Sequence, residues 1–155
     1  MPTTFASRDK RVITINVPKD RVAAALSSPE QIKGFLADDL ERGEVVDPTT
    51  LHIVRKPVEE KGVKFRGDYQ VRYSHDGNGN ITWKTITTGN MRSTGTAKVT
   101  ALDANRSQLE YDEAIECDME VNRILGAVLR PIIERKVKGG IATYLDKVKT
   151  ALERK

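Results

Sequence analysis

One long amphipathic helix is the feature of this sequence that most limits how the chain can fold. From Val121 to Leu152, apolar residues recur at intervals of three and four, the spacing of a helix with one broad apolar face. A face of this length needs an equally long apolar surface to cover it. Pro131 lacks a backbone donor, so we expect it to bend the helix or to begin a new first turn.

The middle of the chain supplies such a surface, because it has the two-residue period of strands with one buried face. The clearest predicted strand runs from Val63 to Tyr73, where apolar residues and Gly67 occupy the odd positions. The segment HDGNGN at 75–80 predicts a hairpin turn, since Asp-Gly and Asn-Gly favour positive φ angles. Other strands are predicted at 45–46, 51–54, 81–88, 93–101 and 108–117. The pattern predicts an antiparallel sheet.

Near the N-terminus, a strand is followed directly by two short helices. Residues 12–17 alternate, with Ile13, Ile15 and Val17 on one face. Pro18 ends this strand, and Asp20 is expected to cap the first helix.

The second short helix has a clearer start. Ser28 is a favoured N-cap residue, Pro29 fits the first helical position, and Glu30 suits the positive end of the helix dipole. Its buried edge is predicted to comprise Ile32, Phe35 and Leu36.

Composition excludes several classes of protein. With 155 residues, 38% hydrophobic and 31% charged, the chain fits one domain spanning 1–155. No apolar run approaches the roughly 18–20 residues of a membrane span. The N-terminal segment lacks the apolar core of a signal peptide, and the single cysteine, Cys117, cannot form an internal disulfide. We therefore expect a cytoplasmic protein.

The positive charge is concentrated in the C-terminal segment. A net charge of +4 is too small to indicate nucleic-acid binding, so no nucleic-acid partner is predicted. Residues 121–155, however, hold 9 Lys/Arg against 3 Asp/Glu. Two interpretations stay open: a solvated outer helix face, or a docking stripe for an acidic partner or an anionic membrane surface. The residues that would form such a stripe are Arg130, Arg135, Lys138, Lys147 and Lys149.

The order of these elements resembles that of the START-like (SRPBCC) superfamily, which includes polyketide cyclases, coenzyme-Q-binding proteins and the birch-pollen allergen family. The segments that carry the resemblance are ITINVPKDRVAAALSSPEQIKGF, GTAKVTAL followed by SQLEYDEAI, and LGAVLRPIIERKVKGGIATYLDKVKTALE. The resemblance implies an α+β helix-grip fold, in which a curved seven-stranded antiparallel sheet wraps a long C-terminal helix. Two short helices after the first strand close one end. It also implies a cavity for a lipid, a polyketide or an isoprenoid-like molecule.

Glu113 is the most unusual residue on the predicted inner face of the sheet, which it shares with Tyr111 and Cys117. A carboxylate facing a cavity is costly to desolvate, so it must be paired, protonated, or in contact with water or ligand. A raised pKa there would suit acid–base chemistry or binding of a polar ligand group. Alternatively, a bulge turns Glu113 outward, or it forms an ion pair with Arg92 or Arg123.

An aromatic set falls on the same predicted face. Its rings would form apolar walls and its hydroxyls would orient a ligand, although simple core filling is an alternative interpretation. The set comprises Phe65, Tyr69, Tyr73, Trp83 and Tyr111. From the long helix, we expect Val128, Leu129 and Ile132 to complete the ligand-binding wall.

The sequence offers little support for other chemistry. His52 and His75 lack partners at metal-ligand spacing, and Cys117 is interpreted as a small buried apolar residue. There is no nucleophile elbow, phosphate loop or dinucleotide-binding loop, so neither a metal nor a cofactor is predicted.

Three functions remain as hypotheses. The first is binding of a hydrophobic small molecule in the cavity, and the second is a cyclase- or dehydratase-type enzyme in which Glu113 and a tyrosine transfer protons. The third is an interaction module that acts through the basic helix. A cavity below roughly 300 Å³ would leave a drug-sized ligand nowhere to sit and would favour the third hypothesis.

Overall fold

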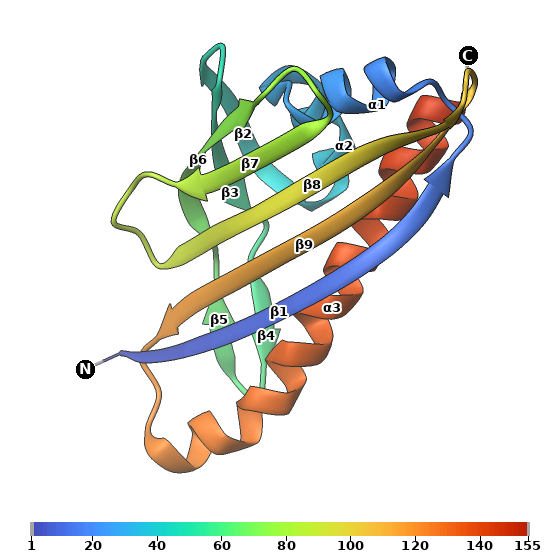
Figure 1. The fold of residues 1–155 in the computed structure, drawn as a ribbon. Coiled ribbons are helices and arrows are strands. Elements are labelled where there is room, and N and C mark those ends of the chain that lie inside the picture. The colour runs from blue at the N-terminus through green and yellow to red at the C-terminus, as the bar shows by residue number, and fades with distance from the viewer. Residues whose placement is uncertain (1, 155) are drawn as a thin grey trace.

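A seven-stranded antiparallel sheet bends around one long helix in the computed structural model, which describes residues 2–154 (Figure 1). The strand order is β1-β9-β8-β7-β6-β3-β2. The strands are β1 (Thr3–Ile15), β2 (Leu40–Asp47), β3 (Thr50–Arg55), β6 (Asp68–His75), β7 (Asn80–Thr85), β8 (Met91–Asp103) and β9 (Arg106–Met119). The predicted α+β helix-grip fold is confirmed.

Strand β1 is much longer than its apolar alternation predicted. It begins at Thr3 and pairs with β9 along its whole length, from Thr3 opposite Met119 to Ile15 opposite Ser107. Its first half was missed because the partly buried positions there carry polar residues, including Ser7, Asp9 and Arg11, which hide the two-residue period.

The two short helices, α1 (Lys19–Leu26) and α2 (Pro29–Phe35), and the 3₁₀ turn η1 (Ala37–Asp39) cover one end of the sheet (Figure 1). Ser28 caps α2 as predicted, because its hydroxyl accepts the Gln31 N–H at 3.3 Å. Asp20 does not cap α1. Pro18 occupies the N-cap position, and no side chain caps this helix.

Removing the Ser28 cap gives the first testable prediction. Ser28→Ala leaves the Gln31 N–H without its partner, which should lower the free energy of unfolding by about 1 kcal/mol. For a chain of this size that corresponds to a fall in Tm of roughly 2–4 °C, measured by circular dichroism. Ser28→Asp keeps a capping oxygen and should melt close to wild type. An equal loss in both variants would contradict the capping role.

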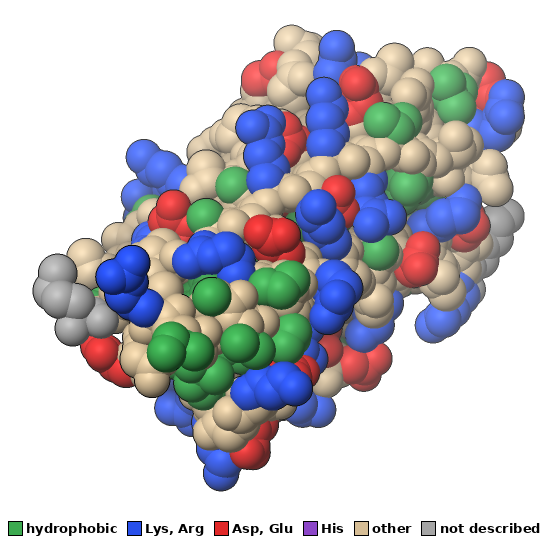
Figure 2. Space-filling model, turned by 90° about the horizontal axis from the view of Figure 1, so that it is seen from below, with side chains coloured by type: hydrophobic (Ala, Val, Ile, Leu, Met, Phe, Trp, Pro, Cys, Tyr) green, Lys and Arg blue, Asp and Glu red, His purple; other side chains and the backbone are tan. Residues whose placement is uncertain are grey.

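The long helix α3 (Arg123–Glu153) begins at Asn122, whose side chain accepts the Leu125 N–H at 2.8 Å. Its second half is firmly packed, with Ile141, Leu145, Val148 and Leu152 buried. Its first turns run at an angle to the rest in Figure 1 and leave hydrophobic side chains on the surface in Figure 2. Pro131, the predicted point of disturbance, lies inside this helix.

The predicted strand from Val63 to Tyr73 is in fact two strands. Its first part, β5 (Val63–Phe65), pairs with β4 (Val58–Glu60) in a separate hairpin, which the sequence did not reveal. The break falls at Arg66-Gly67. A Cβ on Gly67 would lie 2.6 Å from the Met91 sulfur, so any side chain at this position would have to displace that of Met91 on β8.

Candidate functional site

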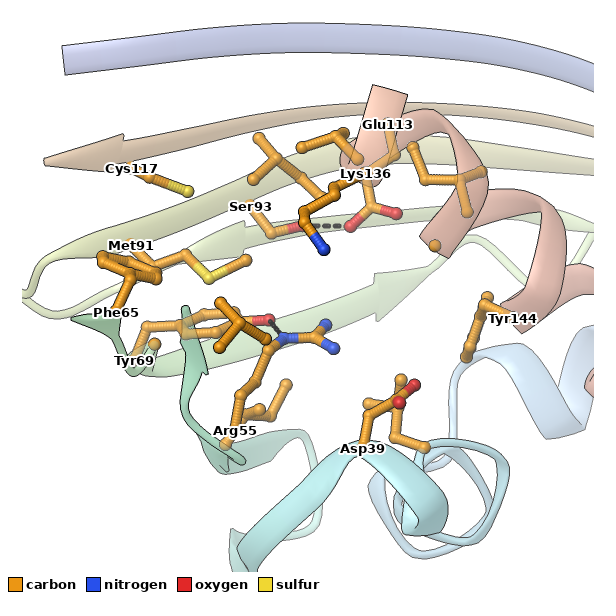
Figure 3. Close-up of a pocket in the computed structure, with 18 of the residues that line it drawn as sticks. Asp39, Arg55, Phe65, Tyr69, Met91, Ser93, Glu113, Cys117, Lys136 and Tyr144 are labelled. Carbon is orange, nitrogen blue, oxygen red and sulfur yellow. Dashed lines mark hydrogen bonds between the residues drawn. The ribbon is translucent and has the colours of Figure 1, made fainter. Parts of the chain in front are cut away.

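A cavity of about 230 Å³ lies between the inner face of the sheet and the middle of α3 (Figure 3). A curved sheet diverges from a helix along part of its length, and here side chains do not fill the gap. Leu26, Ile32 and Leu36, from α1, α2 and the turn after α2, close one end. Five of the residues that line the cavity are exposed to solvent: Asp39, Lys56, Val58, Lys136 and Gly140. The mouth of the cavity therefore lies between α3 on one side and η1 and β4 on the other.

Most of the predicted site residues line this cavity. They are Phe65, Tyr69, Tyr73, Trp83, Tyr111, Glu113 and Leu129. Two predictions for the helix were wrong: Val128 is 46% exposed, and neither Val128 nor Ile132 lines the cavity, whereas Ile133 does. The apolar residues come in the adjacent pairs 128/129 and 132/133, and spacing alone does not tell which member of each pair faces inward.

Aromatic rings form a continuous wall along the cavity. The Trp83 ring lies 5.1 Å from that of Tyr111 and 6.2 Å from that of Tyr73, centre to centre. Tyr144, contributed by α3, lies 5.9 Å from Tyr111 and was not predicted. Burial raises the pKa of Tyr73 and of Tyr111 well above the usual value, so their hydroxyls are neutral.

Glu113 lies in the wall at the centre of a hydrogen-bonded cluster. The Ser93 hydroxyl donates to its Oε2 at 2.5 Å, and the Tyr111 hydroxyl donates to its Oε1 at 3.0 Å. The Trp83 indole N–H in turn donates to Ser93 Oγ at 3.1 Å. Burial raises the pKa of the Glu113 carboxyl, against the lowering effect of these two hydroxyls and of the Arg55 charge. The Glu113 carboxyl therefore takes up a proton at a higher pH than an exposed glutamate does.

The outward alternatives for Glu113 are wrong. Strands β8 and β9 stay in register through Gly95 opposite Glu113, so no bulge turns the carboxyl outward. No ion pair involves Glu113 among residues 2–154. Arg92 instead pairs with Glu116 and Asp118.

Arg55 lines the cavity and was not predicted from the sequence. Its Nε–H donates to the Tyr69 hydroxyl at 3.1 Å, and its guanidinium lies 5.9 Å from the centre of the Tyr69 ring. No carboxylate of the described chain lies within ion-pair distance of it. Figure 3 shows the guanidinium and the Glu113 carboxyl pointing into the same space from opposite walls.

Arg55 keeps its charge although it is partly buried. Burial alone lowers the pKa of this guanidinium, but Tyr69, Glu113 and Asp39 together hold it above the usual value. A partly buried cation that forms no ion pair within the described residues is unusual, since charges withdrawn from water are normally paired. The remaining N–H groups are therefore available to a molecule in the cavity.

Two other residues of the wall have simpler roles. Burial raises the pKa of the Cys117 thiol to about 11, in keeping with a small apolar side chain. At the mouth, the Lys136 ammonium lies 2.9 Å from the Glu60 carboxylate and links α3 to β4.

The described part of the chain, residues 2–154, shows neither a metal cluster nor a helix able to span a membrane. No three His, Cys, Asp or Glu residues between 2 and 154 are arranged to hold a metal ion. Within the same range, no helix combines the length and hydropathy needed to cross a bilayer. His52 instead lies 2.7 Å from Asp68, and His75 is exposed.

Comparison with known proteins agrees with this architecture. The sequence profile of the family described as "Polyketide cyclase / dehydrase and lipid transport" matches residues 9–153. The chain belongs to this family. Membership of this polyketide cyclase and lipid transport family supports a role in hydrophobic ligand binding or in cyclase chemistry. A search of curated proteins found no significant match.

Solved structures share the fold at low sequence identity. The Zhui aromatase/cyclase from Streptomyces sp. R1128 superposes with a TM-score of 0.71 at 17% identity, covering 96% of this chain and 94% of that one. A START superfamily protein from Mycobacterium smegmatis gives 0.69 at 11% identity, covering 95% and 97%. Norcoclaurine synthase from Thalictrum flavum, in complex with dopamine and hydroxybenzaldehyde, gives 0.64 at 15%, covering 98% and 90%.

Proposed function

We propose that the protein binds a small hydrophobic molecule with one acidic or strongly polar group, held by Arg55. The observation that carries this proposal is a permanent, partly buried cation that lines an aromatic cavity and forms no ion pair with any carboxylate of residues 2–154. A ligand carboxylate or enolate would accept hydrogen bonds from the remaining N–H groups of Arg55, and these bonds would be strengthened by the opposite charges. The rest of the ligand would lie against Tyr73, Trp83 and Tyr111.

The cavity volume limits the size of this ligand. An apolar cavity of about 150 Å³ accepts benzene, so about 230 Å³ holds one ring with a short chain. This is less than the roughly 300 Å³ expected for an enclosed drug-sized ligand, so the volume by itself favours the interaction hypothesis over an enclosed ligand of that size. The molecule is therefore small, or part of it extends through the mouth between Val58 and Lys136. A fully enclosed lipid or polyketide does not fit this volume.

Ligand binding can be tested with a matched pair of probes. Phenylpropanoate and its neutral amide have nearly the same shape and differ by one charge. Trp83 is the single tryptophan of the chain and lines the cavity, so its emission reports occupancy directly. We expect the acid to bind at least about tenfold more tightly than the amide, because only the acid forms a charged pair with Arg55. Equal affinities, or an unchanged emission with both, would refute the proposal.

A second candidate function is proton transfer to a bound carbonyl compound, as in cyclases and dehydratases. The Ser93–Glu113–Tyr111 cluster favours it, since a carboxyl with a raised pKa stays protonated to a higher pH than an exposed one and can donate that proton to a ligand. In that case Glu113→Gln would abolish turnover while the binding of phenylpropanoate persisted. Parallel losses of binding and turnover would instead leave Glu113 as a ligand-orienting residue.

The raised pKa of Glu113 also predicts how stability depends on pH. The folded protein holds this proton more tightly than the unfolded chain does, so the contribution of Glu113 is fully present below the unfolded pKa of about 4.3. It is lost as the pH rises through the higher folded pKa. Glu113→Gln should therefore gain stability relative to wild type as the pH rises above the unfolded pKa and through the folded one, measured by urea unfolding. Glu110→Gln, on the outer face of the same strand, controls for loss of a carboxylate; a difference that did not vary with pH would contradict the prediction.

A further inference from the structure

We propose that the first turns of α3 form a docking surface for anionic lipid bilayers. Ile124 is 81% exposed and Val128 is 46% exposed, one helical turn apart. Ala127 and Pro131 are exposed on the same side of the helix, at positions i+3 and i+7 from Ile124. These four residues form the apolar stripe. Figure 2 shows hydrophobic side chains gathered on this face, with Lys and Arg side chains around them.

The apolar stripe is a real departure from an ordinary surface. Single exposed apolar side chains are common and need no explanation. Here, however, four such residues follow consecutive helical turns, and Ile124 is the most exposed of the large hydrophobic residues in the described chain. A contiguous exposed patch of this kind marks a surface that meets another apolar phase.

Basic residues around the apolar stripe indicate which kind of apolar surface it meets. Residues 120–140 carry five Lys/Arg against two Glu, and residues 56–66, which include the β4–β5 hairpin, carry four against two. Their combined charge of +5 exceeds the +4 of the whole chain, so the remaining residues sum to −1. The Lys136–Glu60 ion pair joins the two segments. The positive charge of the protein is therefore concentrated where its apolar stripe lies.

An anionic bilayer fits this combination better than a protein partner does. Interfacial helices present an apolar face flanked by Lys and Arg, and each cation near an anionic surface adds to binding. A specific protein interface needs about 800 Å² on each side, far more than four side chains on one helix supply. The bilayer provides both the apolar phase and the negative charge, without requiring a complementary shape.

The position of the apolar stripe links docking to the cavity. Leu129 and Ile133 lie on the opposite side of the same helical turns and line the cavity, while Val58 and Lys136 lie at its mouth. A docked α3 would bring the mouth to the membrane surface. A hydrophobic ligand could then pass between bilayer and cavity without crossing water. This second step rests on the proposed ligand-binding function, whereas docking itself does not.

Vesicle co-sedimentation tests the docking directly. The protein should bind phosphatidylcholine vesicles that contain one third phosphatidylglycerol, and not vesicles of phosphatidylcholine alone. Binding should weaken with added salt, because part of it is electrostatic. I124S/V128S should lower the partition coefficient at least about tenfold, while V12S/I86S, which alters two exposed apolar residues outside α3, should leave it unchanged. R135Q/K138Q should weaken binding and reduce its salt dependence.

Several outcomes would overturn the docking proposal: equal binding to both kinds of vesicle, no binding to either at low salt, or an equal loss in V12S/I86S. A wild-type dimer that becomes monomeric in I124S/V128S, measured by sedimentation, would assign the apolar stripe to a second copy and refute bilayer docking. Phenylpropanoate affinity should be unchanged in I124S/V128S. Docking and ligand binding can therefore fail separately and be told apart.

Discussion

Replacing Arg55 with methionine is expected to weaken the binding of phenylpropanoate by about two orders of magnitude and that of its neutral amide by less than about threefold. Methionine keeps most of the length and volume of the side chain and removes only the charge and its donors. A buried charge-assisted hydrogen bond is worth about 1.5–3 kcal/mol, and each 1.4 kcal/mol is tenfold in affinity. Trp83 emission, read in titrations of each probe, measures the two changes.

Arg55→Lys provides the matched control for this prediction. Lysine restores a positive charge but not the planar fork of donors, so it should recover only part of the affinity for the acid. Equal losses of acid and amide in Arg55→Met would show that Arg55 shapes the cavity and does not recognise charge. The emission maximum without ligand should stay at its wild-type wavelength, which shows that the wall around Trp83 is intact.

The same substitution should not destabilise the free protein. Arg55 is a partly buried cation whose guanidinium, among residues 2–154, has the Tyr69 hydroxyl as its hydrogen-bonding partner. Replacing a partly buried charge that has no ion-pair partner with an apolar side chain of similar volume removes the cost of desolvating that charge. We expect the Tm of Arg55→Met to equal or exceed that of wild type, measured without ligand. A gain in stability together with a loss of affinity is the signature of a residue kept for binding.

Glu113 and Arg55 show what alternation along the sequence can find and where it fails. Glu113 was identified because the period through Tyr111, Glu113 and Cys117 is unbroken. Arg55 continues the series Leu51, Ile53, Arg55 on β3 and would have been found by the same argument. The predicted strand stopped at Val54, one residue too early, because a charged residue followed by Lys56-Pro57 is typical of a loop.

The partners of Glu113 could not be predicted, for a different reason. Ser93 and Trp83 belong to neighbouring strands, and their contact with Glu113 depends on the register across β7, β8 and β9. That register is set by the length and conformation of the connecting turns, which the periodicity within each strand does not encode. The cavity itself is likewise a product of sheet curvature and of the angle of α3, both of which arise from packing.

The register also places Gly95 between Trp83 on β7 and Glu113 on β9, and this contact leads to the largest expected effect on stability. A Cβ on Gly95 would lie 2.3 Å from the Trp83 ring and 2.5 Å from the Asp112 carbonyl oxygen. The backbone oxygen cannot move aside without breaking the β8–β9 ladder. Gly95→Ala should therefore lower the free energy of unfolding by about 1–3 kcal/mol, the usual cost of overpacking.

The Trp83 ring must shift to admit the new methyl group, so Gly95→Ala should also alter the cluster that holds Glu113. We expect a fall in Tm of roughly 2–10 °C, a shifted Trp83 emission maximum and weaker binding of phenylpropanoate. Gly139→Ala is the matched control, because a Cβ there has no neighbour within 4 Å and alanine favours the helix. It should raise stability slightly and leave both emission and binding unchanged. A Gly95→Ala protein as stable as wild type would mean that the indole does not lie against β8, which would remove the support for the hydrogen bond from Trp83 to Ser93 and for the Glu113 cluster built on it.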